Sequence, residues 1–451
     1  MRERDLSDAR GAALAALLAI AGGAAAGQAL DQALQAVPDP RDRRLVTELV
    51  YGVTRRRLSL DQELTGLCSR PLDGLQPEVL ATLRLGLYQL RHTDRIPPHA
   101  AVHGAVALVR AAGRPQAAGL VNAVLRRAAG AAGPVSGSTD LAESASHPAW
   151  LVERWLARLG PEQTRALLEA DNLPPAVTLR VNRLRADRAE LLAELQASGC
   201  PAAPGRWAPE AVRLAPGSPP RALAAIPEGR CSVQGEGSML VGHLADPRPG
   251  WLCLDVAAAP GGKATHLAEL MGDRGTVVAN DVDERRAAAC AANARRLGLE
   301  AVRTRVGDAR GLPEDFAGRC DLVVADVPCS GLGTLAQRPD LRWRKREGDI
   351  LRLAALQTQI LAAAARCVKP GGRLVYSTCT TEPEENEAVV AGLLAERPDF
   401  VPEDVASRLP LGLATPAAAA GLVRLWPHLH GTEGFFIAVL RRNRPGPGKE
   451  R

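Results

Sequence analysis

Strand-like and helix-like segments alternate through the second half of the chain, and this alternation limits the possible folds more than any other feature. Runs typical of strands lie at 252–256, 276–280, 302–306, 322–326 and 373–377. Ala-rich segments typical of helices lie between them, among them 285–297 and 351–367. This order predicts a doubly wound, mostly parallel α/β sheet. Two later runs, 421–426 and 435–441, predict an antiparallel pair that closes the sheet.

The front of the chain predicts helices only. Apolar residues recur there at spacings of three and four, as in Leu80, Leu83, Leu87 and Leu90. Aromatic residues are scarce in this region, so it is not a platform on which bases stack. Arginines cluster at 55–57 and 126–127. From charge alone, these clusters fit an RNA-contacting face and a solvated face equally well.

The predicted elements divide the chain into five parts. Residues 1–130 form an all-helical domain, and residues 147–245 form a small α+β subdomain. The stretch between them, 131–146, begins rich in Ala, Gly, Pro and Ser and is expected to be a linker. Residues 246–442 form the Rossmann-like sheet domain. The polar end, 443–451, is expected to be disordered.

Composition narrows the class of protein. The net charge is +6, and only four of the 56 basic residues are lysines. Arginine suits forked contacts with phosphate. The nine cysteines include no C-x-x-C pair, so they indicate neither a zinc site nor a disulfide framework. Their odd number fits reduced thiols in the cytoplasm.

Residues 11–30 carry no charge, but they predict neither a signal peptide nor a membrane span. Gly22 and Gly23 interrupt the stretch, and it is mostly Ala and Gly, hence only weakly hydrophobic. Acidic residues precede it, where a signal peptide would be basic. We therefore expect no membrane association.

The first predicted strand runs into a turn of small residues before a helix. The turn consists of Ala257, Ala258, Ala259, Pro260, Gly261, Gly262 and Lys263. Small residues let the backbone approach a ligand, and the helix N-terminus offers free N–H groups. The pattern is not G-x-G-x-x-G, because alanines stand where glycines would, so a dinucleotide pyrophosphate turn is disfavoured.

Acidic residues stand at the carboxyl ends of four predicted strands, where ligands of open α/β sheets bind. They are Asp255, Asp281, Asp308 and Asp326. We expect Asp281 to contact ribose hydroxyls. S-adenosylmethionine fits such a site, because it needs ribose and adenine contacts but no pyrophosphate cradle.

Two cysteines, Cys329 and Cys379, follow predicted strands fifty positions apart. A thiolate that adds to carbon 6 of cytosine makes carbon 5 nucleophilic, so that it can accept a methyl group. A helix predicted to start near Pro383 would help ionise Cys379. The spacing leaves open which cysteine attacks. The other seven cysteines fit small buried hydrophobic residues.

Two further features have alternative interpretations. Asp326 either donates a proton or hydrogen bond to N3 of cytosine, or only orders its loop. The basic segment 338–346 contains Trp343. It either holds the RNA backbone and stacks a base, or it is a surface loop with a docked tryptophan.

Taken together, these motifs resemble the bacterial cytosine-C5 ribosomal RNA methyltransferases of the RsmB/Sun/Fmu family. The resemblance rests on 255–263, on 326–330, on 377–379 with 383–386, and on 337–343 and 433–436. The front segment is similar to the helical RNA-binding domain of the antitermination factor NusB, through 43–52, 96–102 and 119–126. Two departures from the family pattern are Ala257, where Cys is usual, and Glu433, where Asp is usual.

The resemblance implies an S-adenosylmethionine-dependent enzyme that methylates 16S ribosomal RNA, before the subunit is assembled. It implies that Cys379 attacks carbon 6 and that Cys329 assists product release. It implies cofactor contacts from the turn 257–263 and from Asp281, Asp308 and Asp326. We expect no metal and a monomer. Two rival functions remain: a DNA cytosine methyltransferase, whose nucleophile would be Cys329, and a non-catalytic RNA-binding assembly factor.

Overall fold

The structure is a computed structural model that describes residues 9–131, 140–215, 224–413 and 415–444. The chain forms two compact units. The helical unit contains Met1–Leu173 and Leu335–Lys345, and the sheet unit contains Pro174–Thr334 and Arg346–Arg451. Most of the predicted tail, 443–451, lies outside the described residues.

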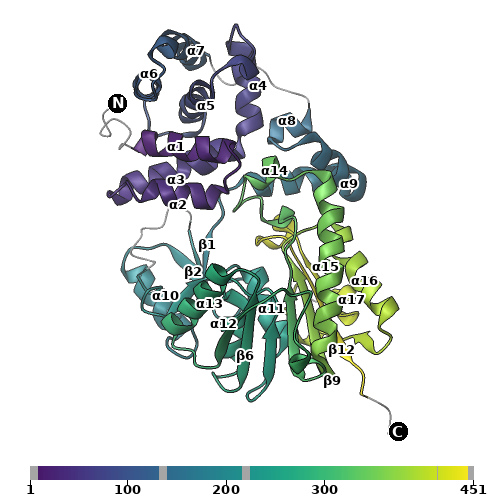
Figure 1. The fold of residues 1–451 in the computed structure, drawn as a ribbon. Coiled ribbons are helices and arrows are strands. Elements are labelled where there is room, and N and C mark those ends of the chain that lie inside the picture. The colour runs from purple at the N-terminus through teal and green to yellow at the C-terminus, as the bar shows by residue number, and fades with distance from the viewer. Residues whose placement is uncertain (1–8, 132–139, 216–223, 414, 445–451) are drawn as a thin grey trace. The chain divides into compact units, whose positions relative to one another are not determined.

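The helical unit confirms the prediction of an all-helical front segment (Figure 1). Its helices are α1 (Ala9–Ala21), α2 (Ala26–Leu34), α3 (Pro40–Arg55), α4 (Arg57–Leu67), α5 (Pro77–His92), α6 (Pro98–Ala111), α7 (Ala118–Gly130), α8 (Leu141–Ala145), α9 (Ala149–Asn172) and α14 (Leu341–Arg344), with 3₁₀ turns η2 (Leu72–Gly74) and η3 (Pro115–Ala117). Proline occupies the first turn of α3, α5 and α6, where its missing N–H costs nothing. Leucines at the predicted spacing fill the core, with Leu83 and Leu87 fully buried.

The helical unit extends further along the chain than the predicted domain. Helix α8 lies inside 131–146, which the composition of the sequence predicts to be a linker. Helix α9 also belongs to this unit, although its sequence was assigned to the α+β subdomain. Asp140 caps α8 by accepting a hydrogen bond from the N–H of Ala142 at 2.7 Å. A local cap of this kind in a Ser- and Ala-rich stretch is easily overlooked.

The segment Leu335–Lys345 packs within the helical unit, although it interrupts the sheet domain in sequence. Arg342 is 1% exposed. It donates hydrogen bonds to the carbonyl oxygens of Arg55, Ser146 and Asp171 and to Oδ1 of Asn172. Trp343 donates from Nε1 to the carbonyl oxygen of Thr54 at 2.8 Å. Of the two interpretations of this segment, the docked tryptophan is therefore the one that the structure supports.

A small antiparallel sheet begins the sheet unit. Its strands follow the order β2-β3-β1-β4. They are β1 (Val177–Val181), β2 (Ala202–Pro204), β3 (Ala211–Leu214) and β4 (Cys231–Val233). Helix α10 (Arg188–Ala197) packs against it through Leu191 and Leu195. Helix α11 (Glu236–Ala245) then leads into the large sheet.

The large sheet has the order β10-β12-β9-β8-β5-β6-β7, with β11 paired to β12. Its strands are β5 (Leu252–Asp255), β6 (Thr276–Asp281), β7 (Val302–Val306), β8 (Cys320–Asp326), β9 (Val368–Thr378), β10 (Phe400–Pro402), β11 (Leu422–Leu425) and β12 (Phe435–Arg442). Strands β5 to β9 are parallel, and β12 pairs antiparallel with β9 and β11. The predicted parallel sheet and its closing antiparallel pair are confirmed.

Helices cover both faces of the large sheet (Figure 1). On one face, α11, α12 (Gly262–Leu270) and α13 (Glu284–Leu297) share a core with β5 and β6. On the other, α15 (Glu347–Cys367) and α16 (Glu387–Glu396) pack on β8 and β9. Strand β5 lies between β6 and β8, so the strand order reverses there, and the carboxyl ends beside it are where such sheets bind ligands.

The helix predicted near Pro383 begins later than expected. Pro383–Glu385 is a 3₁₀ turn, η7, and α16 starts only at Glu387. Asn386, with φ −116° and ψ −98°, separates the two. Cys379 therefore lies before a 3₁₀ turn rather than directly before an α-helix, and the ionisation of its thiol by a helix end stays a prediction.

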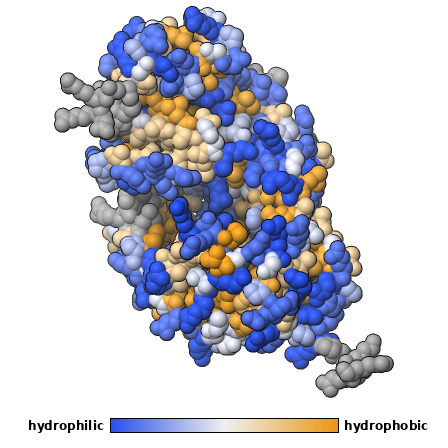
Figure 2. All heavy atoms as spheres, in the orientation of Figure 1, coloured by the Kyte–Doolittle hydropathy of each residue, from blue (hydrophilic) through white to orange (hydrophobic). Residues whose placement is uncertain are grey.

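Two features concern membrane association, which the sequence does not predict: the distribution of hydrophobic side chains on the surface and the length of the helices. On the face drawn in Figure 2, hydrophilic side chains surround small hydrophobic patches. Within the described residues, no helix combines the length and the apolar character that crossing a bilayer requires.

Candidate active site

The predicted cofactor turn lies between β5 and α12, at the reversal point of the sheet. Gly261 has φ 98°, a left-handed conformation, and a Cβ there would lie 3.2 Å from Cα of Cys290. Asn293 donates from Nδ2 to the carbonyl oxygen of Pro260 at 2.8 Å. Thr265 donates to the carbonyl oxygen of Gly261 at 2.7 Å. Helix α13 and the first turn of α12 thus hold the backbone of the turn in place.

Two of the strand-end acids lie beside this turn. Asp281 is 2% exposed and accepts a hydrogen bond from the N–H of Ala259 at 3.2 Å. Burial raises the pKa of Asp255 to about 7, and the nearby charge of Asp326 adds to this effect. Asp308 is more exposed and pairs with Arg310 at 2.6 Å, which holds its pKa below the usual value. These groups fit an adenosine-type cofactor, because the buried carboxylate of Asp281 and the backbone of the turn lie together at the carboxyl-end rim of the sheet.

Lys263 connects the cofactor turn to the end of β8. Its Nζ lies 2.7 Å from Oδ2 of Asp326, and Ser377 donates to Oδ1 of the same carboxylate at 2.8 Å. Burial of Lys263 opposes its charge, but the charge of Asp326 and the hydrogen bond to it prevail, so the pKa of Lys263 lies above its usual value. The lysine ammonium also acts electrostatically on Cys379.

The structure brings the two predicted cysteines together. Sγ of Cys329 lies 3.3 Å from Sγ of Cys379, and both residues are partly buried. The hydrogen bond to Cys379, together with burial, raises the pKa of Cys329 well above its usual value. Either sulfur can be the donor in this contact, so the two thiols can share one proton.

Sequence reasoning missed a buried carboxylate, Glu385, that fixes the loop after Cys329. Glu385 is fully buried. It accepts hydrogen bonds from N and Oγ of Ser330, at 2.8 and 2.5 Å, and from Nε2 of Gln357 at 2.9 Å. The sequence of 383–386 predicts a helix start and carries part of the family resemblance, but it assigns no role to Glu385. The excess of acidic residues at that site was the signal available in the sequence.

A second missed residue, Arg180, ties the small sheet to α12. It is fully buried and forms an ion pair with Glu269 at 2.8 Å. It also donates to the carbonyl oxygen of Gly262 at 2.5 Å and to Oγ1 of Thr265 at 3.0 Å. This guanidinium therefore holds the helix that carries Lys263.

Models of three families match the chain. The model of the 16S rRNA methyltransferase RsmB/F matches residues 243–441, and that of the NusB family matches 7–130. The ferredoxin-like domain of RsmF/B-like methyltransferases matches 147–219.

Curated relatives are similar over most of the chain. The probable ribosomal RNA small subunit methyltransferase B of Bacillus subtilis (strain 168) is 38% identical over 412 residues, which cover 89% of this chain and 91% of the relative. The ribosomal RNA small subunit methyltransferase B of Klebsiella pneumoniae subsp. pneumoniae is 39% identical over 434 residues, 93% of this chain and 95% of the relative.

Solved structures are also similar to this chain. The crystal structure of PH0851 has a TM-score of 0.81 at 30% identity and covers 96% of this chain and 98% of that one. A methyltransferase homolog protein from Pyrococcus horikoshii has a TM-score of 0.56 at 31% identity, over 67% of this chain and 97% of that one. The chain belongs to the family of the ribosomal RNA small subunit methyltransferases RsmB, with a NusB-family helical region before its Rossmann-like methyltransferase domain.

Proposed function

We propose that this ribosomal RNA methyltransferase transfers a methyl group to carbon 5 of a cytosine in 16S ribosomal RNA, through a covalent bond between Cys379 and carbon 6. The observation that carries the proposal is the pair of thiols 3.3 Å apart at the ends of β8 and β9. S-adenosylmethionine, the cofactor of such enzymes, supplies the activated methyl group. The turn 257–263 and the carboxylate of Asp281 would hold it, with Asp308 at the edge of the same site.

Cys379 is the proposed nucleophile. Cys329, whose pKa is raised, would keep the proton in the resting pair, and the ammonium of Lys263 favours negative charge on the sulfur of Cys379. Its thiolate adds to carbon 6, and the electron pair of the 5,6 double bond moves toward N3 of the ring. A proton held between Lys263 and Asp326 at 2.7 Å is available to neutralise N3. Carbon 5 then takes the methyl group.

Cys329 is the proposed base that completes the reaction. Once Cys379 is bonded to carbon, it no longer raises the pKa of Cys329, so Cys329 can release its proton to solvent. Its thiolate then removes the proton from carbon 5. The 5,6 double bond re-forms, Cys379 leaves as a thiolate, and N3 gives its proton back. Without Cys329, the methylated adduct would persist.

The test uses full-length protein, tritiated S-adenosylmethionine, and either unmodified 16S RNA or duplex DNA. We expect label on RNA, no label with Cys379→Ala, and a protein–RNA adduct that survives denaturation with Cys329→Ala. Label on DNA, with Cys379→Ala still active, would establish the DNA methyltransferase instead. Binding of RNA without any label would leave only an assembly factor. Either result would overturn the proposal.

The helical unit is the proposed second RNA contact. Arg126 and Arg127 are exposed on α7, whereas Arg55 is 7% exposed and donates to the carbonyl oxygen of Ala336. Only part of the predicted basic clusters is thus available to phosphate. We expect Arg126→Ala to lower the salt dependence of RNA binding by about one released counterion. An unchanged slope of RNA affinity against salt concentration would show that Arg126 does not contact the RNA.

A further inference from the structure

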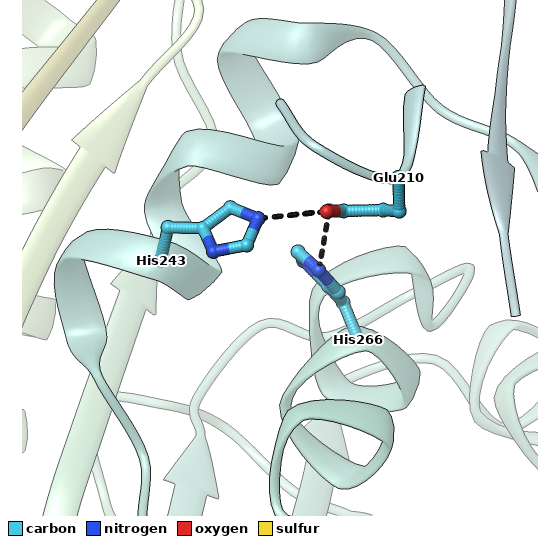
Figure 3. A group of neighbouring side chains, drawn as sticks. All are labelled: Glu210, His243 and His266. Carbon is cyan, nitrogen blue, oxygen red and sulfur yellow. Dashed lines mark hydrogen bonds and ion pairs between the residues drawn. The ribbon is translucent and has the colours of Figure 1, made fainter. Parts of the chain in front are cut away.

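A cluster of one carboxylate and two imidazoles lies in the sheet unit, formed by residues with no role in the proposed reaction. Figure 3 shows Glu210 pointing between His243 and His266. Glu210 directly precedes β3, His243 lies on α11, and His266 lies on α12. Nε2 of His243 lies 2.9 Å from both carboxylate oxygens, and Nε2 of His266 lies 2.9 Å from Oε1. One ligand atom from each residue lies within 4.8 Å of the other two.

At neutral pH, the buried members of this cluster are in the forms that bind a metal ion. Burial would raise the pKa of Glu210, but the hydrogen bond with His243 and the close approach of His266 outweigh burial and hold it far below the usual value. Burial lowers the pKa of His266 to about 4. A carboxylate and a neutral imidazole both offer a lone pair to a cation, and for Nε2 to be the ligand the imidazole proton moves to Nδ1.

His266 is poorly satisfied by the protein alone. Its residue is 1% exposed, and neither ring nitrogen makes a well-directed hydrogen bond to another described residue. The 2.9 Å approach to Glu210 is therefore a close contact rather than an aligned hydrogen bond. Buried polar atoms without such a bond are uncommon, and an unrecorded ion is one of the usual reasons.

The charge of the cluster also lacks a compensating cation. Among the described residues, the ion pairs of Glu210 involve only His243 and His266. The nearby Arg180 is paired with Glu269 at 2.8 Å and does not serve Glu210. A divalent cation would supply the positive charge that a buried carboxylate requires.

We propose that Glu210, His243 and His266 bind a divalent transition-metal ion of the zinc class. One carboxylate and two imidazoles form a donor set that zinc uses, with water as the fourth ligand. Tetrahedral ligands at about 2.0–2.1 Å from zinc lie roughly 3.3 Å apart. The present 2.9 Å contacts therefore need to open by only a few tenths of an ångström. His243, whose side chain is 19% exposed, provides the path for the ion and its water.

The bound ion would brace the proposed catalytic framework. It would join the loop before β3 to α11 and to α12, the helix that begins at the cofactor turn. The sequence predicts no metal, because its cysteines lack the spacing of a zinc site. The three residues lie 33 and 23 positions apart and form no local motif.

The test measures metal binding directly, by calorimetric titration of chelator-treated full-length protein with Zn²⁺ and by the visible absorption of bound Co²⁺. Cys329 and Cys379 are replaced by serine in every sample, because their thiols would also bind zinc. We expect one ion per chain, an affinity about 100-fold lower with His243→Ala, and an unchanged affinity with His103→Ala on exposed α6. His243 is the deciding position, since its partly exposed side chain can be truncated without opening a buried cavity.

Two results would overturn the site. One is no stoichiometric binding in the serine background. The other is binding that His243→Ala and Glu210→Gln leave unchanged. If the cluster is only a hydrogen-bonded network, His243→Ala lowers the melting temperature of metal-free protein, and Zn²⁺ shifts the melting temperature of neither variant nor parent.

Discussion

Replacement of Glu385 should separate the structure of the loop after Cys329 from the chemistry proposed for that cysteine. The carboxylate accepts three hydrogen bonds from Ser330 and Gln357, which are 1% and 0% exposed. Glu385→Ala leaves these donors without that acceptor. Ser330 Oγ keeps a 2.7 Å bond to Thr380, and Gln357 Nε2 keeps a 2.9 Å bond to the carbonyl oxygen of Pro328. The N–H of Ser330 is thus the donor that the substitution leaves without a hydrogen-bond acceptor.

The expected cost follows from this inventory. One buried donor without an acceptor, two weakened bonds and a small cavity together destabilise the protein by about 2–4 kcal/mol. Glu385→Gln keeps one acceptor oxygen and the shape of the side chain, so it should cost about 1 kcal/mol. Because Ser330 follows Cys329, a shift of the loop by about 1 Å should also lower methyl transfer roughly 100-fold in the alanine variant.

The assay combines denaturant unfolding with single-turnover methyl transfer. Glu396→Ala, an exposed glutamate on α16, is the matched control and should change neither quantity. Equal rates for Glu385→Ala and Glu385→Gln would refute the argument that the hydrogen-bond pattern holds the loop. So would a loss of stability in Glu385→Ala no larger than in the control.

Three further predictions concern buried or paired charges. Lys263→Met should lower the single-turnover rate at least about tenfold. The stability should change by less than about 1 kcal/mol, because the side chain of Asp326, the partner of Lys263, is 30% exposed. An unchanged rate would show that the ion pair takes no part in the reaction. Burial raises the pKa of Asp171 from 3.8 to about 7, so its contribution to stability is fully present below about pH 4 and is lost as the pH rises to about 7. Calorimetry should show that Asp171→Asn flattens the fall in melting temperature between about pH 4 and 7, and a curve parallel to that of the parent would contradict this. Arg180→Met should lower the free energy of unfolding by about 3–5 kcal/mol, because it leaves Glu269 buried and unpaired. Denaturant unfolding should show that adding Glu269→Met restores much of this loss. No recovery in the double variant would show that the lost ion pair is not the cause.

Local patterns were enough to predict the frame of the sheet unit. Strands that end in Asp281 and Asp326 were recognised from their composition, and the parallel order follows from the helices between them. The meeting of Cys329 and Cys379 followed from the same rule, because neighbouring parallel strands present their carboxyl ends at one rim. In each case the information lies within a few residues of the feature.

Features that depend on distant partners were not predictable in this way. Arg180 pairs with Glu269 across 89 positions, and nothing near either residue indicates the other. Arg342 looked like one charge in a basic loop, but it is buried among carbonyl groups up to 287 positions away. The α-helix predicted near Pro383 begins only at Glu387, because Asn386, which accepts a hydrogen bond from Thr378 at 2.5 Å, leaves the helical conformation.

The location of Leu335–Lys345 within the helical unit limits how the protein can be dissected. The chain passes from one unit to the other three times, after Leu173, after Thr334 and after Lys345. A clone of the catalytic half that starts at Pro174 would still carry this stretch, with Arg342 and Trp343 deprived of every acceptor they use. A clone of the front half would lack it and leave the same acceptors bare. The two units therefore cannot be exchanged between relatives as two continuous segments of chain. Any exchange has to move the eleven-residue insert together with the helices that receive it.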